Sequence, residues 1–143
     1  MGPRRLLSLL CCLPLLAGCE NEGTAYLIQG KDESIALLRE QRWFWSDKVT
    51  QFLVVSRMPT CLRRYEIRPG TTASVKVEVF EYGDRVWALR QGRNWYLVGT
   101  QSCQFQRWEE APLEPPGALV GTFTRKDGQL AFVAPKAGAA EER

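Results

Sequence analysis

Apolar and polar positions alternate along most of the chain between residues 25 and 134. In the segment 74–82, Val75, Val77 and Val79 occupy every second position, and polar side chains fill the positions between them. A repeat of two residues is typical of a β-strand with one buried face. Further short extended segments are expected at 25–29, 35–45, 49–57, 62–67, 85–90, 95–100, 103–108, 119–125 and 129–134.

Turn-forming residues separate these segments. Pro69-Gly70 and Gly83-Asp84 interrupt the pattern, and Asp127-Gly128 between two apolar runs is the strongest hairpin signal in the chain. We therefore predict an all-β fold, a single antiparallel meander of about nine or ten short strands closed as a small barrel or sandwich. Residues 34–41 also contain good helix formers after a candidate cap, so a short helix is the alternative there.

The N-terminal residues have a different character. Arg4 and Arg5 precede a mostly apolar run of eleven residues, 6–16, and the small residues Ala17 and Gly18 follow it. Such a run is too short to cross a hydrocarbon layer of about 30 Å as a helix. A positive start, a short apolar run and small residues form a cleaved export signal, which we expect at 1–18.

The sequence Leu16-Ala17-Gly18-Cys19 resembles the lipobox of small bacterial, proteobacterial-type lipoproteins, a match that covers four residues. The resemblance implies that the chain is cut before Cys19 and that the Cys19 thiol carries a covalent lipid, the one cofactor expected. Glu20 stands where members of this class retained in the inner membrane tend to carry aspartate. The resemblance therefore implies the outer membrane, with the protein facing the periplasm. The rest of the chain resembles no characterised family.

The mature chain would run from Cys19 to Arg143 and have the length of one domain. We divide it into a polar tether at 19–24, a β domain at 25–134 and a disordered tail at 135–143. The whole sequence has 19 Lys and Arg against 16 Asp and Glu. Without the signal these charges nearly balance, so we expect no nucleic acid as a partner.

Cys61 and Cys103 are the two cysteines that remain after Cys19. An even pair in an oxidising compartment favours a disulfide. A metal-binding or redox pair is the alternative, but the chain has neither histidine nor a Cys-x-x-Cys motif. The absence of histidine also removes the commonest acid–base group and metal ligand, so we expect no catalytic residue, no metal site and no enzymatic activity.

Two groups of side chains are candidates for binding. Arginines crowd around Cys61, and their planar guanidinium groups suit phosphate and carboxylate ligands; a solvated rim is the alternative interpretation. Trp43-Phe44-Trp45 would place rings on both faces of a strand, and an exposed ring suits contact with a protein or a sugar; core packing is the alternative. The candidate binding residues are Arg57, Arg63, Arg64, Arg68, Trp43 and Trp45.

Two functions fit these observations. The first is a non-catalytic envelope lipoprotein that is held to the membrane by its lipid and binds a protein or a cell-envelope partner. The alternative is a binder of small ligands or lipids with an apolar barrel interior. A large cavity lined by Trp43, Trp87 and Trp95 would favour the alternative, and a filled core with an exposed patch of aromatic and arginine side chains would favour the first.

Overall fold

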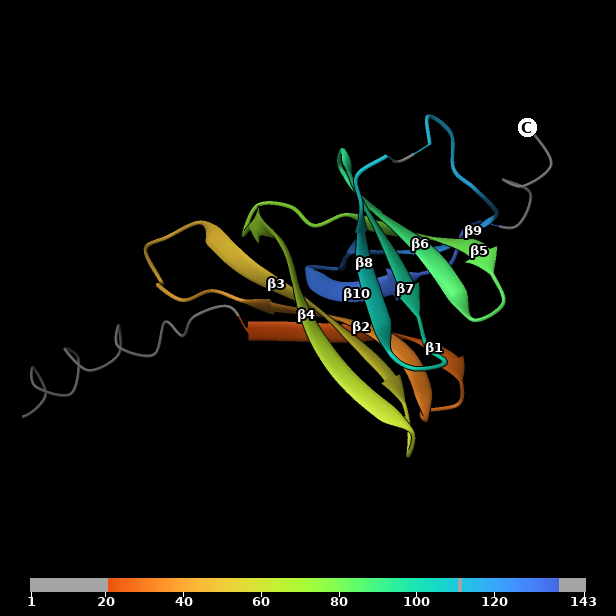
Figure 1. Ribbon diagram of the computed structural model, residues 1–143. Coiled ribbons are helices and arrows are strands. Elements are labelled where there is room, and N and C mark those ends of the chain that lie inside the picture. The colour runs from red at the N-terminus through yellow and green to blue at the C-terminus, as the bar shows by residue number, and fades with distance from the viewer. Residues whose placement is uncertain (1–20, 111, 137–143) are drawn as a thin grey trace, which may run out of the picture.

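The computed structural model describes residues 21–110 and 112–136, which form ten strands in two antiparallel sheets with no helix (Figure 1). The all-β prediction and the expected number of strands are confirmed within these ranges. The strands are β1 (Asn21–Gln29), β2 (Glu33–Glu40), β3 (Lys48–Arg57), β4 (Cys61–Thr71), β5 (Val77–Gly83), β6 (Val86–Gln91), β7 (Asn94–Gly99), β8 (Gln104–Trp108), β9 (Leu119–Lys126) and β10 (Gln129–Val133).

The connections differ from a single meander. The first sheet is a meander in the order β1-β2-β3-β4, but the second has the order β10-β9-β5-β6-β7-β8. After β8 the chain passes along a connector and returns β9 to the free side of β5, where Val77 pairs with Phe123. The sheets are not closed into a barrel, since no described strand of one sheet pairs with a strand of the other.

The alternative of a helix at 34–41 is wrong, because this segment is β2. Ile35, Leu37 and Arg39 are fully buried and alternate with the less buried Ala36 and Leu38. Backbone pairing with β1 on one side and β3 on the other fixes this period of two. Pairing on both sides outweighs the weak helix propensity of the segment.

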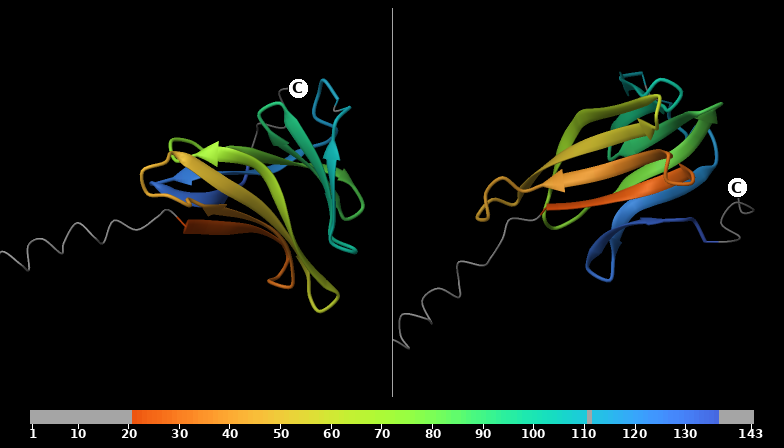
Figure 2. Two further views of the ribbon diagram at one scale, coloured as in Figure 1. Left: turned by 60° about the vertical axis from the view of Figure 1, so that its left-hand side comes forward. Right: turned by 90° about the horizontal axis from the view of Figure 1, so that it is seen from below.

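The core lies between the two sheets, which face each other in Figure 2. Strand alternation directs one set of side chains from each sheet into this layer. The first sheet contributes Ile35, Leu37, Leu53, Val55 and Ile67, and the second contributes Val77, Val79, Leu89, Tyr96, Val98 and Phe123. The two sheets therefore share one apolar core.

The ends of the predicted domain need adjustment. The segment 21–24, predicted as part of a tether, is the first half of β1. The signal at 1–18 and the lipidation site Cys19 lie outside the described residues, as does the predicted tail apart from 135–136. No helix in the described part of the chain is long and apolar enough to span a membrane.

Candidate functional site

Trp43, Phe44 and Trp45, which we call the aromatic tip, lie in the loop that joins β2 to β3. We predicted them on a strand, but β2 ends at Glu40 and β3 begins at Lys48. The three side chains are 50%, 65% and 68% exposed. Their rings touch one another: Trp43 stacks on Trp45 with 5.0 Å between ring centroids, and Phe44 meets Trp45 edge-on at 4.9 Å.

Polar contacts shape the loop and leave the rings outside. The Ser46 amide donates to the carbonyl oxygen of Trp43 at 3.0 Å, and the Gln41 side-chain amide donates to the Ser46 carbonyl at 2.6 Å. The Thr72 amide donates to the Asp47 carbonyl at 2.8 Å, which joins the loop to the segment after β4. The exposure of the aromatic tip thus results from a hydrogen-bonded loop.

The aromatic tip projects from the end of the first sheet at which β1 begins. Asn21 pairs with Glu40, the last residue of β2 before the loop. Figure 1 shows the start of β1 and the β2–β3 loop on the same side of the molecule, and the views in Figure 2 agree. The first described residue and the aromatic tip therefore share one end of the domain.

A buried arginine organises this end. Arg39 is fully buried and donates to Gln51 Oε1 at 3.1 Å, to Glu22 Oε1 at 2.8 Å and to the backbone carbonyl of Thr71. Arg125 of β9 binds the same Glu22 carboxylate at 2.8 and 3.0 Å. Glu22 therefore links the beginning of β1 to both sheets.

The four arginines predicted as one candidate site are divided between surfaces. Arg63 shares a strand face with Cys61 and Tyr65, whereas Arg64 lies on the opposite face of β4. Arg57 is paired with Cys61 at the end of β3, and Arg68 lies beside a bulge between β3 and β4. The structure does not bring these side chains together as one patch.

Arg64 has its own partners on the outer face of the first sheet. Its guanidinium group donates to Glu40 Oε1 at 2.8 Å and lies 3.6 Å from the centroid of the Phe52 ring. Beside it, an open groove of about 640 Å³ runs past Leu38, Phe52 and Thr50 toward the β2–β3 loop. This groove combines an apolar wall with charged rims and is continuous with the end that carries the aromatic tip.

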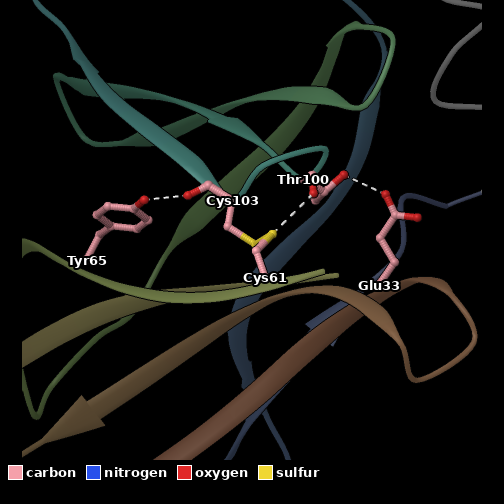
Figure 3. The surroundings of a disulfide bond; sticks show 5 residues. All are labelled: Glu33, Cys61, Tyr65, Thr100 and Cys103. Carbon is pink, nitrogen blue, oxygen red and sulfur yellow. Dashed lines mark hydrogen bonds between the residues drawn. A yellow bond between two sulfur atoms is a disulfide. The ribbon is translucent and has the colours of Figure 1, made fainter. Parts of the chain in front are cut away.

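The opposite end of the domain holds the disulfide between Cys61 and Cys103, which confirms the predicted pairing (Figure 3). Cys61 begins β4, and Cys103 lies between β7 and β8, so the bond joins the two sheets. The Tyr65 hydroxyl donates to the carbonyl oxygen of Cys103, and the Tyr65 and Phe105 rings stack at 4.9 Å. The disulfide and the Tyr65 contacts thus connect β4 of the first sheet to the β7–β8 region of the second.

Near the disulfide, Glu33 is buried with two donors from loops of the second sheet, Arg85 between β5 and β6 and Thr100 just after β7. Thr100 Oγ1 donates to Glu33 Oε1 at 2.5 Å, and Arg85 donates to Glu33 Oε2 at 2.6 Å (Figure 3 shows the first contact). Burial raises the pKa of the Glu33 carboxyl, but these hydrogen bonds and the charges of Arg85 and Arg57 outweigh burial and lower the pKa below its ordinary value.

Sequence reasoning missed the buried charges Glu33 and Arg39. Both lie on the inner face of β2 together with Ile35 and Leu37. The available signal was that Glu33 and Arg39 lie at intervals of two residues from Ile35 and Leu37. This spacing indicates a shared buried face only if the segment is a strand and not a helix.

Trp43, Trp87 and Trp95 do not line a shared cavity. Trp87 is buried in the main core, while Trp95 packs with Phe80 and Ala88 in a second cluster. Trp43 is exposed on the loop. The three side chains that would have marked a barrel interior therefore occupy three separate places.

No group of three or more potential metal-ligating side chains occurs in the described ranges. No protein-family model, curated protein or solved structure matches this chain. The properties of the site therefore rest on its own geometry, an exposed aromatic loop at one end of the domain and a disulfide between the sheets at the other.

Proposed function

We propose that this chain is a cell-envelope lipoprotein, anchored at Cys19 and facing the periplasm, that acts by binding a partner and not by catalysis. The observation that carries the proposal is the disulfide between Cys61 and Cys103. It uses both cysteines that follow Cys19, and such bonds persist in oxidising compartments such as the periplasm. Cys19, which ends the lipobox-like sequence, is then the one cysteine of the mature chain left to carry lipid.

A filled interior favours binding at the surface over a ligand enclosed in the fold. The core side chains of both sheets pack together, and Trp43, Trp87 and Trp95 are separated. We infer an open two-sheet sandwich, and no observation favours the alternative of a small-ligand or lipid binder with an apolar barrel interior.

The outer face of the first sheet is the surface we assign to a protein partner. One row of paired residues crosses this face from Leu27 on β1 through Ser34 and Ser56 to Leu62 on β4. The two leucines are 58% and 59% exposed, whereas the two serines are buried. This row has an exposed apolar side chain at each end, and Arg64 lies two residues further along β4.

Replacement of Cys19 tests the anchor. Cys19→Ser removes the thiol that would receive lipid, so we expect loss of fatty-acid labelling and accumulation of an uncut precursor. Labelling of cells with radioactive fatty acid, followed by membrane fractionation and mass measurement, provides the result. Normal labelling of the serine variant would overturn the anchor.

Photo-crosslinking tests the binding surface in intact envelopes. A photo-reactive residue at position 62 should give a discrete crosslinked protein, and Leu27→Ser should remove this product because it takes away the exposed apolar side chain at the other end of the row. Leu113→Ser is the matched control, since Leu113 is fully exposed in the β8–β9 connector. Equal loss in both variants, or no discrete product, would contradict the assignment.

A further inference from the structure

We infer that the aromatic tip enters the interfacial layer of the membrane that holds the lipid anchor, so that the domain is attached at two points. This inference rests on the proposed lipid attachment at Cys19. It assigns a role to Trp43, Phe44 and Trp45 and commits to a phospholipid surface as the partner of the loop.

The geometry of the chain places the two attachment points close together. Cys19 precedes Asn21 by two residues and can therefore lie at most about 7 Å from it. Asn21 pairs with Glu40, about 5 Å away across the strand pair. Trp43 follows Glu40 by three residues, a reach of at most about 11 Å. A lipid on Cys19 would thus enter the bilayer beside the aromatic tip.

The beginning of β1 is held firmly enough to define which end of the domain faces the membrane. Backbone pairing to β2 starts at Asn21, and Glu22 is bound by Arg39 and Arg125 from two different sheets. No long tether separates Cys19 from this fixed point. The end with the β2–β3 loop therefore faces the bilayer, and the end with the disulfide faces away from it.

The chemistry of the loop suits the boundary between lipid headgroups and acyl chains. Tryptophan combines a large apolar ring with an N–H group and is enriched at this boundary. The ring contacts within the tip and its hydrogen-bonded turn are already formed, so insertion needs little further ordering.

Charged groups lie near the aromatic tip, and the Arg42 guanidinium group lies over the Trp43 ring at 5.7 Å from its centroid. Arg42 and Lys48 flank the tip in the sequence and are exposed, and so is Lys126 at the end of β9, next to the Arg125 that binds Glu22. Each such cation is attracted to an anionic lipid surface. Asp47 and Asp127 offset part of this charge, so the rings supply the main attraction.

Quenching of tryptophan fluorescence by brominated phospholipids tests the inference on the intact chain reconstituted in vesicles. Bromine quenches only rings that touch lipid, and we expect stronger quenching when bromine lies near the headgroup end of the acyl chain than near its terminus. The double variant Trp43→Phe, Trp45→Phe should lose this quenching. Trp108→Phe is the matched control, because Trp108 lies on β8 of the second sheet, and it should keep the quenching.

Fatty-acid labelling of the same preparations separates the inference from the proposed anchor. Labelled protein with depth-dependent quenching supports both, and labelled protein without quenching overturns the membrane role of the tip alone. Unlabelled protein that is quenched on vesicle addition overturns the anchor but supports contact between tip and lipid. Unlabelled protein without quenching overturns both. Quenching that persists in the double variant would also overturn the role of the tip. A tip that binds only a protein or a sugar would show no quenching by lipid, which overturns the role as well.

Discussion

Glu33 and Arg39 are two charged residues on one face of β2, and each connects segments that are far apart in the sequence. Glu33 accepts hydrogen bonds from Arg85 and Thr100, 52 and 67 residues later. Arg39 reaches Gln51, Thr71 and Glu22. A buried charge is stable only when its partners are complete, so both residues are sensitive positions for stability.

The low pKa of Glu33 predicts a specific pH dependence. A carboxyl whose pKa is lower in the folded than in the unfolded chain stabilises the fold fully above its ordinary pKa of 4.5. This contribution is lost as the pH falls through the lower pKa of the folded state. We expect Glu33→Gln to reduce the free energy of unfolding by about 1–3 kcal/mol at neutral pH and to flatten its decline in acid.

Urea denaturation at a series of pH values measures this effect. Glu109→Gln is the matched control, since Glu109 is an exposed carboxylate beyond β8, and it should leave the pH profile unchanged. Parallel profiles for Glu33→Gln and the unmodified protein would show that Glu33 does not contribute as described.

Arg39 predicts a larger loss of stability. Arg39→Met keeps most of the volume but removes the hydrogen bonds that Arg39 donates to Glu22, Gln51 and the Thr71 carbonyl, so we expect the free energy of unfolding to fall by about 3–5 kcal/mol. Arg39→Lys should not restore it, because an ammonium group lacks the planar fork that reaches several acceptors. Chemical denaturation checks both variants, and full stability of the lysine variant would contradict this explanation.

Among the elements, hairpins were predictable from local residues, while the aromatic loop was not. Asp127-Gly128 predicts the β9–β10 hairpin because both residues tolerate positive φ, and the structure has φ of 52° and 77° there. Trp43-Phe44-Trp45 has strong strand propensity, yet it forms a loop because pairing of β2 with β3 stops at Glu40 and Thr50. The residue at which a strand ends depends on where its partner strand stops pairing, so β propensity alone could not predict the end of β2.

The β9–β10 turn gives a prediction at this scale. A Cβ at Gly128 would meet no atom within 4 Å, so its φ of +77° is the one source of strain in Gly128→Ala. We expect this variant to lose about 1–2 kcal/mol of unfolding free energy. Gly83→Ala is the control, since Gly83 also has open space but no positive φ, and thermal unfolding should separate the two. Equal stability of both variants would contradict the claim that Gly128 is needed for its left-handed backbone conformation.

For the whole molecule, the sequence predicted the class of fold and the disulfide but not the arrangement of the sheets. Return of β9 to β5 after β8 pairs Val77 with Phe123, and no local pattern specifies such a distant partner. The arginines near Cys61 illustrate the same limit. They are close in sequence, but strand alternation directs Arg63 and Arg64 to opposite faces.

The disulfide predicts how the whole molecule loses stability. It closes a loop with a sequence separation of 42, for which chain entropy gives about 4 kcal/mol. On the β4–β8 side, the stacked Tyr65 and Phe105 would remain as a link after its removal. On the other side, Tyr26 of β1 stacks on Phe132 of β10 independently of the disulfide.

We therefore expect the double variant Cys61→Ser, Cys103→Ser to lose about 4 kcal/mol of unfolding free energy and to open first between β4 and β8. Urea denaturation gives the first quantity, and hydrogen exchange should show faster exchange in β4 and β8 than in β1 and β10. A reducing agent should destabilise the unmodified protein but leave the double variant unchanged. Uniform exchange across all four strands would contradict this expectation. The disulfide would then act only by lowering the conformational entropy of the unfolded chain, and it would not hold β4 and β8 together in the folded protein.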